Sequence, residues 1–481
     1  HIHSRWSTVV TAMSFMQQIE RIDEGHYLLP RVGDMTTEVH AFLSEPLFQQ
    51  TDEALWRQAA QAASYPGMLG LYLMPDVHLG YGIPVGGVAV TEDVIIQAGS
   101  GYDISCGVVY LKAPGLHARD VASWNKREKW IQEVELRIAT GIGSHRPKHM
   151  PRIADKTIEE IFRYGARALG VSSDVCERQY ISVDESFLDT ERVQRARSKA
   201  SPQLGSVGGG NHFVEMQVDR DDGSVWIMIH CGSRGYGWQT ANHYFYEGAK
   251  LRGLPKNRRE DSWLRADESL GKEYWAHHNS AANYAVANRH VIVRGVQQAL
   301  EKAFGVTGEV FYEISHNLVQ EETLVLPDGT TTRGFVHRKG ATRAFPAGHP
   351  DLAGTKWEKT GHPCLVPGSM LHGAAILYPK EGAYRSGCSV NHGAGRVMGR
   401  GQAKRSLREQ HDDIDTEMKQ ITRKLGGVRI RGIVGNTRRT PLDECGHAYK
   451  NLDHVLAVLE QQGIAEVAHR LYPVANIKGM D

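Results

Sequence analysis

Residues 101–107, GYDISCG, constrain the fold of this chain more than any other stretch. A carboxylate, Asp103, and a thiol, Cys106, stand three residues apart between glycines, shortly after the apolar run 94–96. Glycine adopts positive φ without steric cost, so such a loop can turn both side chains inward. A thiolate and a carboxylate together suit zinc, manganese or iron. Taken alone, the stretch fits a buried cysteine and a turn aspartate better, so a metal site requires further donors.

Three histidines supply such donors at the ends of predicted strands. The apolar runs 225–230 and 310–316 end in His230 and His316, and the glycine run 208–210 is followed at once by Asn211 and His212. Ligand-bearing residues at strand ends are common in α/β proteins. With Asp103 and Cys106 the histidines make five donors, which only the fold can bring together. A histidine that merely fills the core is the alternative for His230, and a flexible turn is the alternative for the glycine run.

A second chemical centre is predicted around His392. It is followed by Gly393, Ala394 and Gly395, whose amides are accessible, and then by Arg396 and Arg400. A nucleophile beside oriented amides and two arginines suits phosphoryl or nucleotidyl transfer. The alternative is a glycine-rich helix start with solvated arginines. Residues 423–439 hold six Lys or Arg and no acid, which suits a nucleic-acid backbone or simply an exposed basic loop.

Composition sets the class of protein. A chain of 481 residues allows two lobes or one elaborated domain. The net charge of +1 gives no preference for nucleic acid, whereas 24 histidines suit metal or phosphate chemistry. Six cysteines without paired spacing indicate a reducing compartment. Neither an apolar run of about 20 residues nor a signal peptide is visible, so we expect a cytoplasmic protein.

Local patterns predict the elements and their limits. We expect residues 1–15 to be an extension, disordered or added to the natural chain, and residues 16–481 to form one catalytic domain with a helical peripheral lobe at about 145–200. Trp124 and Trp130 are predicted to lie in the core, and for Asp76 and His78 a plain turn is favoured over ligand contact. Asp328-Gly329 predicts a hairpin. Helices are predicted at 52–63, 120–140, 269–304, 404–425 and 451–471.

The motifs, taken in order, resemble the RtcB tRNA-splicing RNA ligases from about residue 16 to the C-terminus. The matching stretches are PDVHLGYG, GYDISCG, GGGNHFVE, HCGSRG, SHN, HRKGA, PGSM, NHGAGR and IKG. The resemblance implies an α/β fold of the RtcB type, with mixed sheets around a central metal and nucleotide cleft and peripheral helices. It also implies a GTP- and manganese-dependent enzyme that joins RNA ending in a 3′-phosphate or 2′,3′-cyclic phosphate to RNA with a 5′-hydroxyl, in tRNA splicing or RNA repair. An archease-like activator is a further implied partner.

The resemblance also assigns residue roles. Cys106 would bridge two manganese ions, one of which also takes Asp103 and His212 and the other His230 and His316. His392 would be the nucleophile that carries GMP. Arg234 and Arg400 match contacts to RNA or phosphate. The positions that match GTP contacts are Asn211, Phe213, Glu215, Ser369, Gly393, Ala394, Gly395, Tyr449 and Lys478.

Two positions depart from the family pattern. Ala374 stands where a serine hydroxyl would help to read guanine, and Gly399 stands where a serine usually precedes the arginine. The first departure predicts looser selection of GTP. The competing function is a metal-dependent RNA-end phosphatase or cyclic phosphodiesterase, which would use the same ions and a bound water. His392 distinguishes the two functions, because a hydrolase needs no covalent nucleotide.

Overall fold

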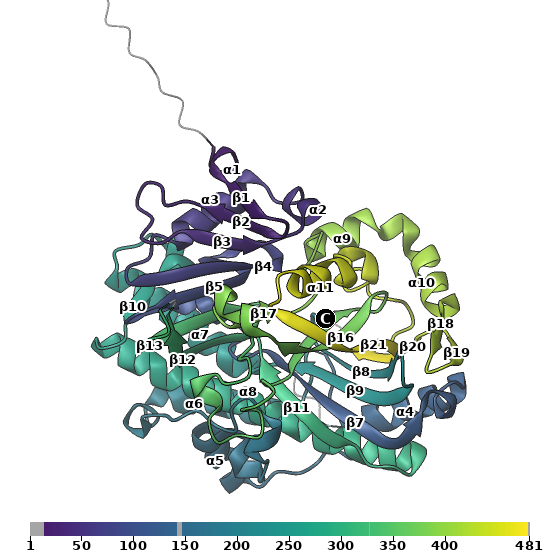
Figure 1. Cartoon of the computed structure of the whole chain (residues 1–481). Helices are drawn as coiled ribbons and strands as arrows, with labels where there is room; N and C mark the ends of the chain where they lie inside the picture. Colours follow the sequence, from purple (N-terminus) through teal and green to yellow (C-terminus); the bar gives the residue numbers. More distant parts are fainter. Residues whose placement is uncertain (1–13, 142–146, 327, 480–481) are drawn as a thin grey trace, which may run out of the picture.

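The computed structural model describes residues 14–141, 147–326 and 328–479 (Figure 1). In this part of the chain, two large mixed sheets form the framework, and helices cover them from outside. The α/β fold predicted from the sequence is confirmed. None of the described helices is long and apolar enough to cross a membrane.

The N-terminal sheet has seven strands, and only its β3–β4 pair is parallel. Its core side is covered in part by α3, which starts at Asp52, whose side chain accepts a hydrogen bond from the Leu55 amide. In spatial order its strands are β1 (Glu20–Asp23), β2 (His26–Leu29), β3 (Val39–Phe42), β4 (Met68–Tyr81), β5 (Ile83–Thr91), β13 (Thr331–Lys339) and β12 (Asn317–Val325).

The second large sheet carries the metal-donor candidates. Its neighbours pair antiparallel, apart from the short β20 (Val434–Gly435), which runs parallel to β21. β21, the last strand of the described chain, lies in the interior of this sheet (Figure 1). The other strands are, in spatial order, β11 (Glu309–Ser315), β7 (Gly107–His117), β9 (Ser224–Cys231), β8 (Phe213–Asp219), β21 (Ala465–Lys478), β16 (Gly373–Pro379) and β15 (Cys364–Ser369).

Three two-stranded pairs complete the β structure: β6 (Val94–Ile96) with β10 (Trp263–Arg265), β14 (Ala341–Arg343) with β17 (Ser389–Asn391), and β18 (Thr422–Leu425) with β19 (Val428–Arg431). The helices are α1 (Phe15–Gln18), α2 (Glu45–Phe48), α3 (Glu53–Ala62), α4 (Trp124–Glu135), α5 (Asp155–Tyr164), α6 (Glu191–Ala200), α7 (Arg234–Leu251), α8 (Ser269–Phe304), α9 (Arg400–Ser406), α10 (His411–Gln420) and α11 (Leu452–Gln461).

Several local predictions are confirmed. The helix predicted at 52–63 is α3, and the one predicted at 269–304 is α8, which ends at Gly305 in the left-handed conformation that terminates helices. The Asp328-Gly329 hairpin joins β12 to β13 in continuous register. Trp130 is completely buried on α4.

Other local predictions are wrong. The helix predicted over 451–471 stops at Gln461, because Gly463 has a φ of 62° and turns the chain into β21. Residues 404–425 form α9, α10 and then β18 rather than one helix. Trp124 is 37% exposed at the start of α4, so it is not a core residue. Of the extension predicted at 1–15, Ser14 and Phe15 are structured, since Ser14 caps α1 and the Phe15 amide donates to Glu53; residues 1–13 lie outside the described part.

Candidate active site

The register of the second sheet brings four predicted donors to one edge. Gly107 at the start of β7 pairs with Ser315 at the end of β11 and with Cys231 at the end of β9. Phe213 at the start of β8 pairs with His230 on β9. Cys106, His212, His230 and His316 therefore emerge side by side, because each lies at or next to the end of one of four adjacent strands.

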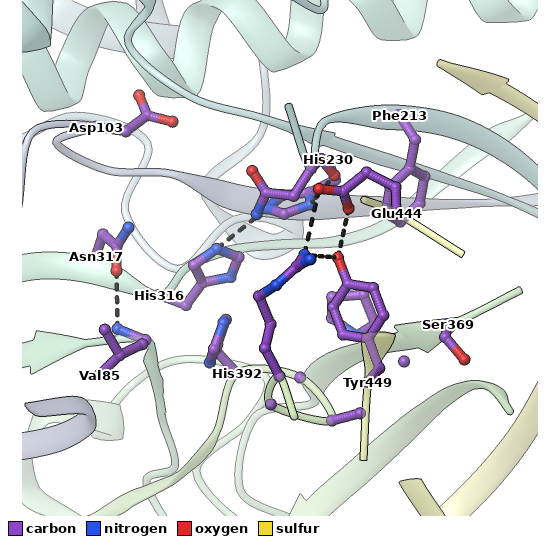
Figure 2. A pocket seen from close by; sticks show the side chains of 18 of the residues that line it. Val85, Asp103, Phe213, His230, His316, Asn317, Ser369, His392, Glu444 and Tyr449 are labelled. Carbon is purple, nitrogen blue, oxygen red and sulfur yellow. Dashed lines mark hydrogen bonds and ion pairs between the residues drawn. The ribbon is translucent and has the colours of Figure 1, made fainter. Parts of the chain in front are cut away.

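The donor atoms of these residues and of Asp103 form one continuous cluster. Sγ of Cys106 lies 3.2 Å from Nε2 of His230 and 3.4 Å from Nε2 of His212. Nε2 of His212 is 3.0 Å from Oδ2 of Asp103, and the Nε2 atoms of His230 and His316 are 3.2 Å apart. Figure 2 shows His316 reaching toward His230 at the side of the pocket where Asp103 also lies. The structure thus brings together all five predicted metal donors.

Backbone groups orient three of the donors toward the cluster. Nδ1 of His212 lies 3.0 Å from the carbonyl oxygen of Val207, and Nδ1 of His230 lies 3.1 Å from that of Asn211. A carbonyl can only accept, so both Nδ1 atoms carry a proton and both Nε2 atoms face the cluster. Oδ1 of Asp103 accepts from the amide and the hydroxyl of Ser233, which turns Oδ2 toward His212.

Burial and mutual charge shift the pKa values in this cluster. Burial raises the pKa of the Cys106 thiol to about 12, and the Asp103 carboxylate adds to that shift. Burial alone would raise the pKa of Asp103, but its hydrogen bond and charge interaction with His212 outweigh this and hold it at about 2. Burial lowers the pKa of His230 and of His316 well below the usual value, so both are neutral imidazoles. Burial alone would lower the pKa of His212, but the charge of Cys106 and the hydrogen bond with Asp103 outweigh this and raise it well above the usual value. Protons therefore compete with a metal at Cys106 and at His212.

The predicted nucleophile His392 follows β17 and lies beside this cluster, with its ring centroid 5.1 Å from that of His316. Its Nδ1 is 2.7 Å from Oδ2 of Asp76. Oδ2 of Asp76 also accepts from the amides of His392 and Gly393. With a proton on Nδ1, the lone pair of Nε2 is available for attack. The turn favoured for Asp76 is therefore wrong: Asp76 is fully buried within β4 and positions His392.

A cavity of about 640 Å³ opens between the donor cluster, His392 and the C-terminal segments (Figure 2). A cavity of this volume can hold a ligand the size of a nucleotide. Asp103, His230, His316 and His392 line it, while Cys106 and His212 lie buried behind. Arg400 and every residue predicted to contact GTP also line it: Asn211, Phe213, Glu215, Ser369, Gly393, Ala394, Gly395, Tyr449 and Lys478.

The two predicted phosphate-binding arginines both pack on the glycine run. A Cβ at Gly208 would lie 1.7 Å from Nη1 of Arg234, and one at Gly210 would lie 2.8 Å from Nη1 of Arg400. Both glycines also have positive φ, so the run is needed for the arginines to approach the backbone. Arg400 lines the cavity, but Arg234 does not; its Nε donates to the Ser206 hydroxyl.

Sequence reasoning missed an acidic centre in the wall of the cavity. Glu444 is buried and accepts a short hydrogen bond from the Tyr449 hydroxyl, while Nη1 of Arg396 donates to the same hydroxyl at 2.9 Å (Figure 2). Arg400 and Lys478 pair with the same carboxylate at 3.2 and 3.5 Å. Glu444 thereby holds three cations at the cavity wall, and no local pattern around it in the sequence marks that role.

Two further features of the wall bear on selectivity and charge. The carboxylate of Glu215 accepts from the side-chain amides of Gln217 and Asn476, so it faces the cavity as a fixed acceptor. Lys339 is buried, with Nζ donating to the carbonyls of Tyr81 and Ile83, and burial lowers its pKa to about 7.

Ala374 is 1% exposed in an apolar cluster with Phe213 and is not among the residues that line the cavity.

Comparison with known proteins agrees with this geometry. The family model described as tRNA-splicing ligase RtcB matches residues 58–479. The chain belongs to the RtcB family. It is 34% identical to the tRNA-splicing ligase RtcB of Archaeoglobus fulgidus, over 96% of this chain and 99% of the relative. It is 33% identical to that of Thermococcus kodakarensis, over 97% and 100%, and 32% identical to the RNA-splicing ligase RtcB of Mycobacterium tuberculosis, over 88% and 100%.

The RtcB match covers the second sheet and the strands β4, β5, β12 and β13 of the N-terminal sheet. It begins within α3 and runs through β21, so it includes the donor edge, Asp76, His392 and Lys478. The resemblance inferred from the ordered motifs is confirmed at the level of the family.

Proposed function

We propose that this RtcB-family chain is an RNA ligase that uses GTP and manganese to join RNA with a 3′-phosphate or 2′,3′-cyclic phosphate to RNA with a 5′-hydroxyl, in tRNA splicing or RNA repair. The observation that carries the proposal is the position of His392: its ring is oriented by Asp76 and stands between the five-donor cluster and a nucleotide-sized cavity. A plain phosphodiesterase would need the metal donors but not an oriented histidine of this kind.

The donor set fits two manganese ions. The Nε2 atoms of His212 and His230 converge on the thiol of Cys106, and a carboxylate oxygen of Asp103 lies next to them. Such a mixture of nitrogen, oxygen and sulfur donors suits a borderline divalent ion. Cys106 lies centrally and would bridge, with Asp103 and His212 on one ion and His230 and His316 on the other. When bound, the ions would neutralise charge on the transferring phosphorus.

The side chains around the cavity then divide the work. Nε2 of His392 attacks the α-phosphorus of GTP, forming a phosphorus–nitrogen bond as the bond to pyrophosphate breaks. The carboxylate of Asp76 holds the Nδ1 proton and stabilises the positive ring that results. The RNA 3′-phosphate next displaces His392 from GMP, giving an RNA–(3′)pp(5′)G end. The 5′-hydroxyl of the second RNA then attacks the 3′-phosphorus and releases GMP.

The nucleotide would lie along the wall opposite the donors. Phe213 and Tyr449 provide ring faces, and Lys478 has its Nζ 5.5 Å from the Phe213 ring centroid. The fixed carboxylate of Glu215 is suited to accept from the N1–H and amino group of guanine. The amides of Ala394 and Gly395, together with Asn211, Arg400 and Ser369, supply donors for phosphate and ribose oxygens. An archease-like activator remains a further proposed partner.

The test uses His392→Ala and follows the chemical steps separately. Incubated with GTP labelled at the α-phosphate, the natural chain should gain a label that is lost in acid and kept in alkali, as expected of a phosphorus–nitrogen bond. The variant should gain none and should not join a 3′-phosphate RNA to a 5′-hydroxyl RNA. It should still bind manganese, since the five donors are intact, and should still seal RNA whose 3′-phosphate already carries GMP.

A matched control is His447→Ala. This histidine is outside the cavity, and its side chain pairs with Glu417 at 2.7 Å. Labelling and joining should be unchanged in the control. Joining of unactivated RNA by His392→Ala would show that His392 is not the nucleophile. Release of inorganic phosphate or opening of cyclic phosphate by the natural chain, without joining, would favour the hydrolase instead.

A further inference from the structure

A second group of metal-ligand residues lies behind the catalytic edge, outside the cavity. Cys176 follows a short 3₁₀ turn (Ser173–Val175), His290 lies on α8 and Glu313 lies on β11. One ligand atom of each lies within 4.8 Å of those of the other two, and the residues are 5%, 3% and 1% exposed. Backbone pairing of Cys176 with Glu313 places two of the side chains next to each other.

Two polar atoms of this group have no hydrogen-bond partner among the described residues. These are Nε2 of His290 and Oε2 of Glu313, both fully shielded from solvent. The other oxygen of Glu313 is occupied, since Nε of Arg289 donates to it at 2.6 Å. Buried polar atoms are nearly always paired. Two unpaired atoms beside one thiol therefore indicate that a cation bound between them is missing.

The local charges favour a cation at the thiol. Three carboxylates, those of Glu313, Glu177 and Asp174, act on Cys176, against the single guanidinium of Arg289.

We propose that Cys176, His290 and Glu313 bind one zinc ion in a structural site separate from the catalytic donors. A thiolate, an imidazole and a carboxylate oxygen are the ligands zinc takes in proteins, and the buried thiolate favours it over manganese. On binding, the Sγ–H bond of Cys176 breaks, a Zn–S bond forms and the proton leaves to solvent. These three side chains would fill three of the four tetrahedral positions of the ion.

The position of the site gives the ion a structural role. It would tie the segment after the 3₁₀ turn to α8 and β11, where the Glu177 amide already donates to the Glu313 carbonyl at 2.8 Å. Arg289, held by Glu313, also donates to the carbonyls of Ser105 and Cys231. These two residues flank the donor Cys106 and the donor His230, so the zinc would stiffen the base of the catalytic edge without touching it.

The experiment uses the full chain carrying Cys106→Ala, which removes the catalytic thiol. Zinc per chain is measured by mass spectrometry after dialysis against a weak chelator, and cobalt(II) is then exchanged for the zinc. We expect one zinc per chain and a thiolate-to-cobalt charge-transfer band, which in this background cannot come from Cys106. Adding Cys176→Ser or His290→Gln should remove the tightly held zinc, and Cys176→Ser should also remove the band.

The matched control adds Cys364→Ala instead. Cys364 is fully buried as well, and its thiol donates to the Arg343 carbonyl just as that of Cys176 donates to the Ser172 carbonyl, but Cys364 belongs to neither donor group. It should keep both zinc and band. The proposal is wrong if Cys106→Ala protein holds no tight zinc, in which case a proton shared by His290 and Glu313 fills the gap, or if the band survives Cys176→Ser. Because the first measurement leaves the site intact, it decides even if the Cys176 and His290 variants do not fold.

Discussion

Replacing Asp76 by Asn tests how much of the chemistry depends on orienting His392. The carboxylate lies 2.7 Å from Nδ1 of His392 and also accepts from two amides at 3.3 Å each. Asn keeps the size and one oxygen acceptor but removes the negative charge that stabilises a positively charged ring. It can also present its NH₂ group to Nδ1, which would favour the tautomer with the proton on Nε2. Nε2 would then have no lone pair with which to attack the phosphorus.

The magnitude follows from the charged contact between Asp76 and His392. A charge-assisted contact contributes ~1.5–3 kcal/mol, so transfer of GMP to His392 should slow by about 10- to 150-fold. The assay is single-turnover labelling of the protein with α-labelled GTP at saturating manganese. Sealing of RNA already activated with GMP serves as the internal control, since His392 takes no part in that step, and its rate should stay within about twofold.

Asp76→Ala separates orientation from folding. It leaves two buried amides without their acceptor, so it should lower the free energy of unfolding by roughly 1–3 kcal/mol per amide, measured by urea titration. Asp76→Asn retains an acceptor and should be destabilised much less. If labelling by Asp76→Asn is within twofold of the natural rate, or if sealing of activated RNA slows equally, Asp76 does not act through His392.

Three other perturbations address the metals, the buried lysine and nucleotide choice. Cys106→Ala should lose bound manganese together with GTP labelling, because it removes the central donor; retention of two ions by the purified variant would contradict the bridging role. Burial lowers the pKa of Lys339 from 10.5 to about 7, so between these values the unfolded chain binds more protons than the folded one. The free energy of unfolding should therefore rise with pH across that window, by up to about 1.4 kcal/mol per unit, and Lys339→Met should flatten the rise seen in denaturant midpoints between about pH 7 and about pH 9. Because Ala374 is buried and does not line the cavity, Ala374→Ser should leave the preference for GTP over ATP in labelling within about twofold; a rise of a few-fold to about tenfold would show that the new hydroxyl reaches guanine.

The site was predictable where its signals are local. Each histidine donor stands next to a run of strand-forming residues, and a glycine run marks the close approach of Arg234 and Arg400. The spacing of apolar residues and the type of neighbouring residue are enough to place each histidine at a strand end. Only the sheet register shows that the donors meet. The order of the motifs along the chain supplied the family, which the comparisons confirm.

The contacts that were missed join residues far apart in sequence. Asp76 and His392 are separated by 316 positions. The local sequence around a single aspartate is the same whether that residue forms a turn or orients a distant histidine ring. Glu444 likewise gains its role only because Arg396, Arg400 and Lys478 converge on it. The wrong helix at 451–471 has another cause: apolar spacing continues past Gln461, and only the backbone conformation of Gly463 interrupts it.

The interior position of β21 has a consequence for the order of events during synthesis. This strand lies between β8 and β16, and Lys478 at its end points into the cavity. On a ribosome, β8 and β16 must wait with unpaired edges until residues 465–478 emerge, although the donor cluster on β7, β8, β9 and β11 is already available. A nascent chain would therefore assemble the donor cluster before the C-terminal wall of the cavity, and translation that stalls before β21 would yield a product with the five donors but without that wall.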